Sequence, residues 1–240
     1  MSLIWAAAAT ILGVACFVFG LTGFGIGLVA LSLLPFVMPP ATAVPLVAVY
    51  SAVFSLVVAL QLRREVRWPY VRSLLLGAVV GAPLGAWMLV TLPAGALRRL
   101  IGAILLVIVL IEWRGLYPQH KPGRGWALCA GWWSGLLGGA VGTPGPPVIL
   151  YAAAQRWNPR TFKATLQTFF LVNQLVTLGL YRWQGLLTRE VMWLAITFAV
   201  PAILGTAAGI YLFDRTDHTQ FRRIVFAFLS VSGLALIIRG

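Results

Sequence analysis

The first charged side chain of this 240-residue chain is Arg63, and several later stretches are also long and free of charge. A transmembrane helix needs about 20 consecutive apolar residues, so the segment before Arg63 is long enough to enter a bilayer more than once. Hydrophobic residues make up 60% of the chain and charged residues 10%, and the mean hydropathy is +0.93, far outside the range of soluble domains. The sequence therefore predicts an all-α polytopic membrane protein.

About eight apolar segments follow one another along the chain. Their approximate bounds are 3–38, 41–62, 69–92, 97–117, 126–154, 162–181, 190–213 and 221–238. The longest connector runs from Trp113 to Arg124 and divides the chain nearly in half. We predict a first transmembrane repeat at 1–117, a basic connector at 118–125 and a second transmembrane repeat at 126–240. Four basic side chains near the ends of the shorter segments are expected to extend to the membrane interface: Arg98, Arg99, Arg222 and Arg223.

The stretch from Gly135 to Pro147 cannot form one unbroken helix. It holds five glycines and three prolines, yet no charged residue occurs between Gly125 and Gln155. Proline lacks the N–H group and clashes with the preceding turn, and glycine costs about 1 kcal/mol against alanine in a helix interior. Non-helical backbone at membrane depth is tolerated where protein buries it or where it lines a cavity. We therefore predict a broken or re-entrant helix at this position.

The two halves of the chain resemble each other in their glycines. The first half contains Gly20-Leu-Thr-Gly-Phe-Gly-Ile-Gly27, in which Gly20, Leu21, Gly23 and Gly27 match Gly135, Leu136, Gly138 and Gly142 at one offset. A second block matches at another constant offset, with Gly81, Gly85, Arg98 and Arg99 against Gly205, Gly209, Arg222 and Arg223. Two ordered blocks favour two homologous four-segment repeats, each with one broken helix. Whether the repeats are parallel or inverted depends on whether the broken part crosses the membrane.

Broken helices build substrate sites in transporters, because the start of a half-helix offers free N–H groups and a positive dipole end to an anion. We therefore predict an anion site at the two breaks, and favour the break in the second half. The candidate residues of the second half are Gly138, Gly139, Gly142, Thr143, Gly145, Asn173 and Gln174. Those of the first half are Thr22, Gly23, Gly25 and Gly27.

The polar side chains of the sixth segment leave two interpretations open. Gln167, Gln174 and Thr177 are spaced to share one helix face, and Asn173 is turned away from it. Hydrogen bonds between helices would account for them, and so would contacts with a polar anion. Arg156, with Arg160 and Lys163 nearby, is placed to attract anions to a vestibule or belongs to a solvated loop.

The charges exclude some function classes. The chain has 18 Lys and Arg against 5 Asp and Glu, a net charge of +13, but its basic residues lie at segment ends, where they orient the protein and contact lipid headgroups. A nucleic-acid partner is therefore not expected. All five carboxylates lie at segment ends or in loops, which argues against a cation pump.

Catalytic and metal-binding motifs are absent from the sequence. His120 and His218 lie in loops, Cys16 and Cys129 have no CxxC spacing, and there is no GxSxG or P-loop. We expect no enzyme activity, no metal and no cofactor. The glycine ladder Gly77, Gly81 and Gly85 serves either an internal helix contact or a homodimer interface.

At its paired glycine motifs the sequence resembles the TauE/SafE family of sulfite exporter (TSUP-type) transporters. The resemblance includes Gly20 to Gly27 with Pro35, Gly135 to Tyr151, Lys163 to Asn173 and Phe221 to Val225, and it covers essentially the whole chain. It implies a secondary transporter of small sulfur-containing anions such as sulfite, sulfoacetate or thiosulfate, integral to a bacterial inner membrane. One departure is that Phe24 and Ile26 interrupt the first motif.

Two other functions fit the same segments. A passive anion channel would use the breaks as a filter, and a membrane scaffold or assembly protein would use the glycine faces only to pack helices.

Overall fold

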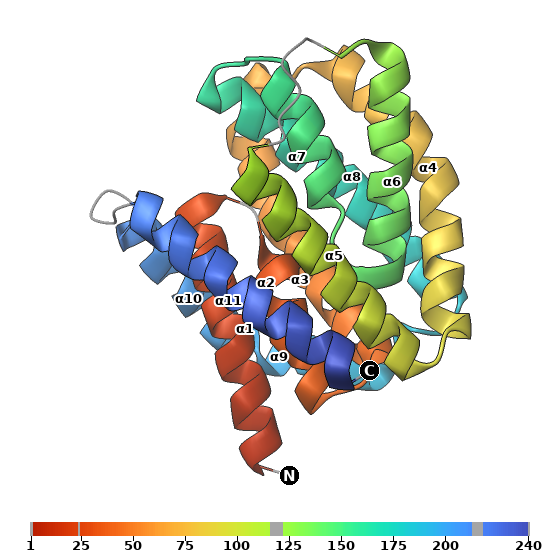
Figure 1. Cartoon of the computed structure of the whole chain (residues 1–240), viewed down its shortest axis with the longest axis vertical. Helices are drawn as coiled ribbons and strands as arrows, with labels where there is room; N and C mark the ends of the chain where they lie inside the picture. The colour runs from red at the N-terminus through yellow and green to blue at the C-terminus, as the bar shows by residue number, and fades with distance from the viewer. Residues whose placement is uncertain (1, 24, 116–121, 213–217, 240) are drawn as a thin grey trace. The chain divides into compact units, whose positions relative to one another are not determined.

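The computed structural model describes residues 2–23, 25–115, 122–212 and 218–239, and within these ranges the chain is helical and contains no strand (Figure 1). The first half forms α1 (Ser2–Thr22), α2 (Ile26–Val37), α3 (Pro40–Gln61), the 3₁₀ turn η1 (Arg63–Glu65), α4 (Trp68–Thr91) and α5 (Ala94–Arg114). The second half forms α6 (Arg124–Val141), α7 (Gly145–Ala154), α8 (Pro159–Trp183), α9 (Arg189–Thr197), α10 (Ala199–Leu212) and α11 (His218–Arg239). The predicted all-α fold class is confirmed.

Four of the described helices are long and apolar enough to cross a membrane, namely α1, α3, α4 and α5. The pair α9 and α10 makes a fifth if it is counted as one bent span, with an angle of 47° at the break. This third break was not predicted. Pro201 explains it, because its nitrogen cannot donate to the carbonyl of Thr197. The total of eight segments stays a prediction.

The chain forms two compact units, which are described separately. Unit 1 contains residues 1–47, 92–114 and 188–240, and unit 2 contains residues 48–91 and 115–187. Each unit draws helices from both predicted halves of the chain, so the units and the halves are different divisions of the molecule.

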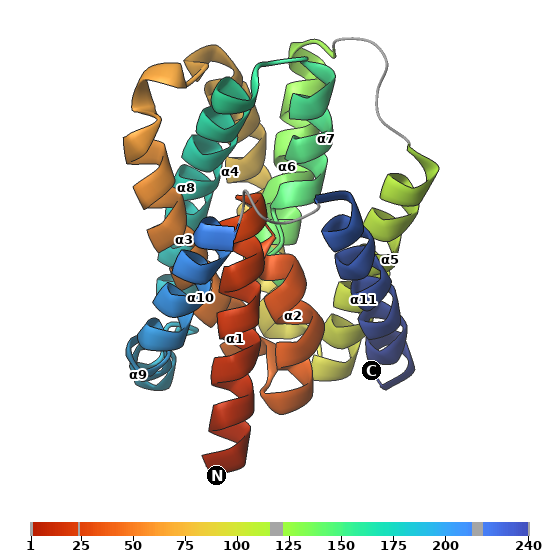
Figure 2. The same ribbon diagram turned by 90° about the vertical axis from the view of Figure 1, so that its left-hand side faces the viewer.

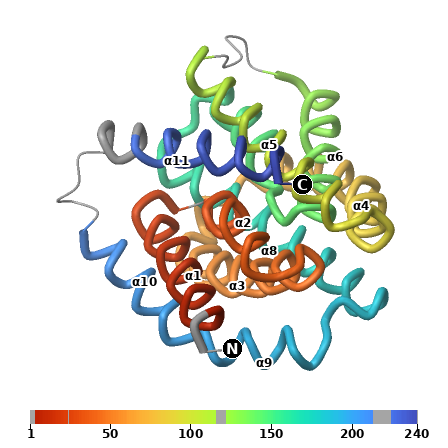
Figure 3. Tube along the Cα trace, turned by 60° about the horizontal axis from the view of Figure 1, so that its bottom comes forward, coloured from red at the N-terminus to blue at the C-terminus, as the bar shows by residue number. Residues whose placement is uncertain are grey.

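In unit 1, α1 lies alongside α10 (Figure 3). Glycines allow this approach. A Cβ atom on Gly205 would lie 2.2 Å from the carbonyl oxygen of Gly13, one on Gly209 would lie 2.2 Å from that of Phe17, and one on Gly20 would lie 2.4 Å from that of Thr206. Real Cβ atoms do not approach backbone this closely. The two helices therefore pack backbone to backbone, the close contact that small residues permit in membranes.

Arg98 anchors the end of the short helix α2 in unit 1. Its Nε donates a hydrogen bond of 3.1 Å to the carbonyl oxygen of Pro35, which no helical N–H can reach because residue 39 is also proline. Arg239 of α11 lies over the ring of Phe36, 5.6 Å from its centre. Arg98 thus caps a helix, and its expected extension to the membrane interface stays a prediction. The side chains of Arg222 and Arg223 lie outside the described part.

In unit 2, α4 lies along α6 (Figure 1) and the contact is lined with glycine on both sides. Cβ atoms on Gly77, Gly81 and Gly85 would each lie 2.1 Å from a carbonyl oxygen of α6. Glycines on α6 that face α4 in the same way are Gly131, Gly135 and Gly139. The ladder on α4 is therefore used inside the unit, which was one of its two predicted roles.

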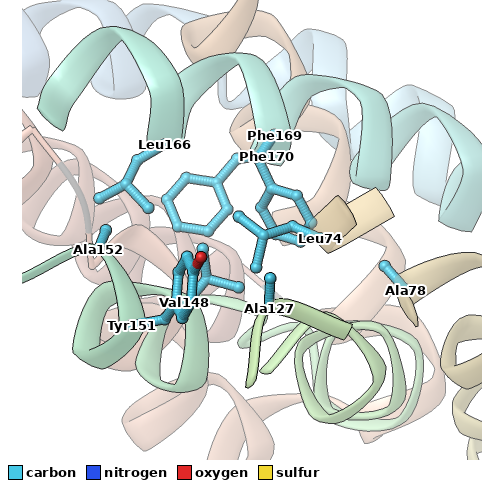
Figure 4. Packing of buried hydrophobic residues seen from close by; sticks show 9 residues of the cluster. All are labelled: Leu74, Ala78, Ala127, Val148, Tyr151, Ala152, Leu166, Phe169 and Phe170. Carbon is cyan, nitrogen blue, oxygen red and sulfur yellow. The ribbon is translucent and has the colours of Figure 1, made fainter. Parts of the chain in front are cut away.

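Helices α6 and α7 form a hairpin (Figure 2). The amide nitrogen Nε2 of Gln155, one residue beyond α7, donates to the carbonyl oxygen of Pro122 just before α6 at 2.9 Å. The chain therefore returns after the break to the end from which α6 started. A cluster of buried side chains between α4, α6, α7 and α8 holds the hairpin (Figure 4). Its members are Leu74, Ala78, Ala127, Val148, Tyr151, Ala152, Leu166, Phe169 and Phe170.

Candidate functional site

The break between α6 and α7 begins at Gly142, the one residue of the turn with a positive φ, at 65°. Its N–H bonds to the carbonyl oxygen of Gly138 at 3.0 Å, and the N–H of Thr143 bonds to that of Leu137 at 3.3 Å. The bond from Gly142 to Gly138 is that of the αL motif, in which a left-handed residue ends the helix by bonding back to its last turn. Glycine suits the position because it adopts this conformation without a steric cost.

The start of α7 offers few backbone donors. The first four N–H groups of a helix have no partner inside the helix. In α7 these positions are Pro144, Gly145, Pro146 and Pro147, and only Gly145 has an N–H group. The N–H groups of Gly142 and Thr143 are used in the cap of α6. Of the backbone donors expected around this break, the N–H of Gly145 is therefore the free one.

Two hydroxyl groups bind the carbonyl oxygens that the break exposes. The hydroxyl of Tyr181, which is fully buried on α8, donates to the carbonyl oxygen of Gly139 at 2.6 Å and lies 3.2 Å from that of Gly138. The hydroxyl of Ser134 donates to the carbonyl oxygen of Pro144. Neither residue was among the predicted candidates. Tyr181 falls seven residues after Gln174, on the same helix face as Gln167, and this spacing was the available signal.

Asn173 lies against the break and its amide has no hydrogen-bond partner among the described residues. Its side chain is 1% exposed, and neither Oδ1 nor Nδ2 is paired. Nδ2 lies 3.1 Å from the point where a Cβ on Gly138 would stand, and Cβ of Pro144 lies 3.1 Å from the same point. Because Gly138 has no side chain, it leaves room for the amide of Asn173. A buried amide without a partner costs about 1–3 kcal/mol, which makes it unusual in a folded protein.

Two further buried polar atoms lack a hydrogen-bond partner in the described part of the chain. One is in the break, and the other is next to Asn173 in the sequence. Oγ1 of Thr143 is one, and that residue is 4% exposed within the break itself. Oε1 of Gln174 is the other, and that residue is 1% exposed. Thr143 is joined to Pro144, whose Cβ borders the same space at Gly138 as the amide of Asn173 does. Asn173 and Thr143 therefore place unpaired polar atoms at the interruption, and Gln174 adds another at the next position of α8.

The site lies deep along α8. At about 1.5 Å per residue, Asn173 is about 21 Å from the start of a helix about 37 Å long. Helix α6 reaches Gly138 at about the same distance from its own start. The break therefore lies somewhat beyond the middle of α8.

Not every candidate residue of the second half faces this site. A Cβ on Gly139 would lie 2.5 Å from the carbonyl oxygen of Ala82, so this glycine packs against α4 and contributes only its own carbonyl to the break. The sixth predicted segment corresponds to α8. There the hydroxyl of Thr177 donates to the carbonyl oxygen of Asn173 at 2.9 Å, so its hydrogen bond is made within the helix. Gln167 is buried at 2% exposure.

The candidates of the first half lie in unit 1. Gly23 and Gly25 both have positive φ, at 78° and 93°, and Gly25 is the N-cap of α2. Gly27 is buried inside α2. The hydroxyl of Thr22 donates to the carbonyl oxygen of Val18 at 2.8 Å, within its own helix. The interruption is present as predicted, although Gly27, which was aligned with Gly142, lies past it.

Charged metal ligands do not gather at either break. No group of three or more His, Cys, Asp or Glu side chains that could hold a metal ion occurs in the described ranges. The site of unit 2 instead combines one N–H, an amide, a hydroxyl and the positive end of a ten-residue helix. Neutral groups of these kinds are able to donate hydrogen bonds to the oxygen atoms of an anion.

Comparison with known proteins indicates the family of the chain. Residues 7–236 match the family model described as sulfite exporter TauE/SafE. The chain is 27% identical over 244 residues to a protein of Cupriavidus necator named "Probable sulfite/organosulfonate exporter TauE", with 95% of this chain and 91% of that protein covered. It is 28% identical over 180 residues to "Probable inner membrane transporter protein TsaS" of Comamonas testosteroni, with 72% and 73% covered. No solved structure matches the chain.

Proposed function

Because this chain belongs to the sulfite exporter TauE/SafE family and is an integral protein of a bacterial inner membrane, we propose that it is a secondary transporter which binds a small sulfur-containing oxyanion at the break before α7. The names of both relatives support a transporter, and one of them includes sulfite and organosulfonates. Sulfite, sulfoacetate and thiosulfate are the substrates to test first.

The unpartnered amide of Asn173 is the observation that carries this proposal. Nδ2 is a strong donor with two hydrogens and no acceptor among the described residues. An oxyanion placed at the break would accept from Nδ2, from the hydroxyl of Thr143 and from the N–H of Gly145. Such an anion would remove the cost of burying these groups unpaired, and the start of α7 would add its dipole.

The site binds its anion with dipoles and with no charged side chain of the break. Deep in the membrane, a full positive charge would hold an anion too tightly to release it, whereas neutral donors balance capture and release. The absence of a carboxylate at the break leaves three forms of coupling: the membrane potential, an exchanged anion, or a proton that travels with the substrate.

We also propose that the two halves of the chain are an internal repeat. The alignment between the halves is taken from the helix contacts. Gly209 packs on Phe17 as Gly85 packs on Leu136, and Gly20 packs on Thr206 as Gly139 packs on Ala82. This pairing aligns Gly20 with Gly139, and therefore Gly23 with Gly142. Both of these cap glycines have positive φ, and each donates its N–H to the residue four before it. In each repeat the broken helix would then pack on the third segment of the other repeat.

The proposal is tested with purified protein in proteoliposomes. The assay follows uptake of labelled sulfite, sulfoacetate and thiosulfate, with sulfate and chloride as controls, with and without an imposed pH gradient. We expect saturable, selective uptake with counterflow. Chloride flux as fast as sulfite flux would instead indicate a channel, and no flux from folded protein would indicate a scaffold.

A matched pair of variants ties the flux to the break. Asn173→Leu removes the amide at similar volume and is expected to reduce sulfite flux about a hundredfold, as the loss of two hydrogen bonds to a charged group predicts. Thr168→Val is the control, because its buried hydroxyl already donates to the carbonyl oxygen of Ala164 at 2.8 Å on the same helix. Equal flux through both variants would remove Asn173 from the site.

A further inference from the structure

A separate basic pocket lies at the opposite end of the α6–α7 hairpin from the break, where α7 ends and α8 begins. Its volume is about 350 Å³. It is lined by Arg67 and Tyr70 at the start of α4, by Arg156, Trp157 and Asn158 of the α7–α8 loop, and by Thr161 of α8. All of these residues belong to unit 2. The transport site described above uses none of them.

Several contacts fix the walls of this pocket. The rings of Tyr70 and Trp157 meet edge to face with their centres 4.9 Å apart. Asn158 caps α8, since its side-chain oxygen accepts from the N–H of Thr161 at 2.7 Å. The N–H of Arg67 donates to the hydroxyl of Thr165 at 3.1 Å. The loop is also short, so the pocket is a built feature of the unit and not a gap between mobile side chains.

The charge around the pocket is positive. Two arginines line it and no carboxylate does. A carboxylate beside the pocket is that of Glu65, whose Oε2 accepts from the hydroxyl of Thr161 at 3.4 Å. Glu65 also lines an adjoining pocket of about 470 Å³ together with Arg63, Arg64 and Arg160. The positive end of α8 adds to this field, so an anionic group would be attracted from the solvent or from the membrane surface.

Arg156 is held in an unusual conformation beside the pocket. Its φ is 55°, and it is the one residue other than glycine with a positive φ in the described part of the chain. This conformation costs about 1 kcal/mol or more for a residue with a side chain. Glycine at this position would be cheaper for the fold. Arg156 therefore brings its positive charge to the pocket from a strained backbone position.

The surroundings indicate which anion fits. Trp68 and Tyr70 lie at the start of α4, which is long and apolar enough to cross a membrane, and Tyr70 contacts Trp157. Aromatic rings at such helix ends mark the boundary between headgroups and hydrocarbon. Farther along α4 is an apolar and exposed face, with Leu76 at 67% and Val80 at 66% exposure. Acyl chains would lie along this face while a headgroup reached the pocket. We propose that the pocket binds the phosphate of an anionic phospholipid between the guanidinium groups of Arg67 and Arg156.

Native mass spectrometry of the detergent-purified protein tests this. Phosphatidylglycerol and phosphatidylcholine of equal chain length are added in competition, and bound lipids are counted. We expect preferential binding of phosphatidylglycerol that falls about tenfold in a protein carrying Arg67→Gln and Arg156→Gly. Arg156→Gly removes the charge and relieves the backbone strain, so the fold is expected to be unharmed. Arg182→Gln, an exposed arginine at the other end of α8, is the control and is expected to bind as the wild type does.

Each other result contradicts the proposal. Equal binding of the two lipids, or an equal loss in the Arg182→Gln control, would mean that the pocket has no role in lipid selection. A second measurement adds inorganic phosphate or sulfite to the lipid-free protein. Binding of those ions with loss in the double variant, without a preference for phosphatidylglycerol, would assign the pocket to a soluble anion instead.

Discussion

The breaks before α2 and before α7 share an outline but differ in backbone chemistry. Each follows a helix that packs on a neighbour through glycine, and each turns on glycines with positive φ. Helix α2 begins with Gly25, Ile26, Gly27 and Leu28, all of which have N–H groups, whereas three of the first four positions of α7 are proline. The break of unit 1 therefore presents backbone donors. The break of unit 2 presents the side chains of Thr143 and Asn173.

A helix can therefore be interrupted in two chemically different ways, one that presents backbone donors and one that presents side chains. A helix start with all its N–H groups attracts many kinds of anion, because backbone donors carry no side-chain identity. Where prolines remove the N–H groups of a helix start, anion binding depends on the surrounding side chains. These side chains can be specific for one substrate. We therefore expect substrate preference to follow the break of unit 2.

The largest effect is expected where the two breaks are alike. Gly20→Leu and Gly139→Leu each place a side chain into the backbone of a packed helix, at 2.4 Å from Thr206 and 2.5 Å from Ala82. Each is expected to cost more than about 3 kcal/mol and to leave little folded protein, as judged by size-exclusion chromatography. Gly179→Leu is the control, because no atom lies within 4 Å of a Cβ there. Normal yields of either packing variant would refute the backbone contact.

A smaller effect should separate the breaks. Tyr181→Phe leaves the carbonyl oxygens of Gly138 and Gly139 without their hydroxyl donor and should destabilise the protein by about 1–3 kcal/mol. Thermal unfolding in detergent measures this, with Tyr211→Phe, on an exposed tyrosine of unit 1, as the control. An unchanged melting temperature would show that the hydroxyl does not support the break.

The smallest effect is expected from a substitution that makes the break before α7 resemble the break before α2. Pro147→Ala gives α7 one more free N–H at its start. If that donor reaches the substrate, the KM for sulfite should fall about two- to tenfold, the range expected of one hydrogen bond. Pro83→Ala, inside α4, controls for the loss of a proline elsewhere. A KM that stays the same would place the anion away from the helix start.

The sequence predicted both glycine breaks because glycine and proline act locally, through φ, ψ and missing donors. The third break, at α9 and α10, was missed because single prolines do not decide the outcome. Pro35, Pro45 and Pro83 lie inside helices that continue. Neighbouring helices determine which proline ends a helix in a membrane, and one sequence does not show them.

The site was predicted less completely. Asn173 and Thr143 were named from their polarity in an apolar segment, which is a strong signal. Tyr181 and Ser134 were missed, because tyrosine and serine are common in membrane helices and their bonds to the break depend on how α6 and α8 pack. The glycine pattern also did not show what each glycine does. Gly139 packs against α4, Gly142 turns the chain and Gly138 leaves room for the amide of Asn173.

The central claim is that a buried neutral amide binds the transported anion. The most direct test is saturable sulfite flux through Asn173→Asp in proteoliposomes, beside wild-type protein and Thr168→Val. Aspartate matches the shape of asparagine but replaces the donor with an acceptor that is negative when ionised, so we predict that flux falls at least about a hundredfold while the protein stays folded. Flux and KM equal to those of the wild type would contradict the claim.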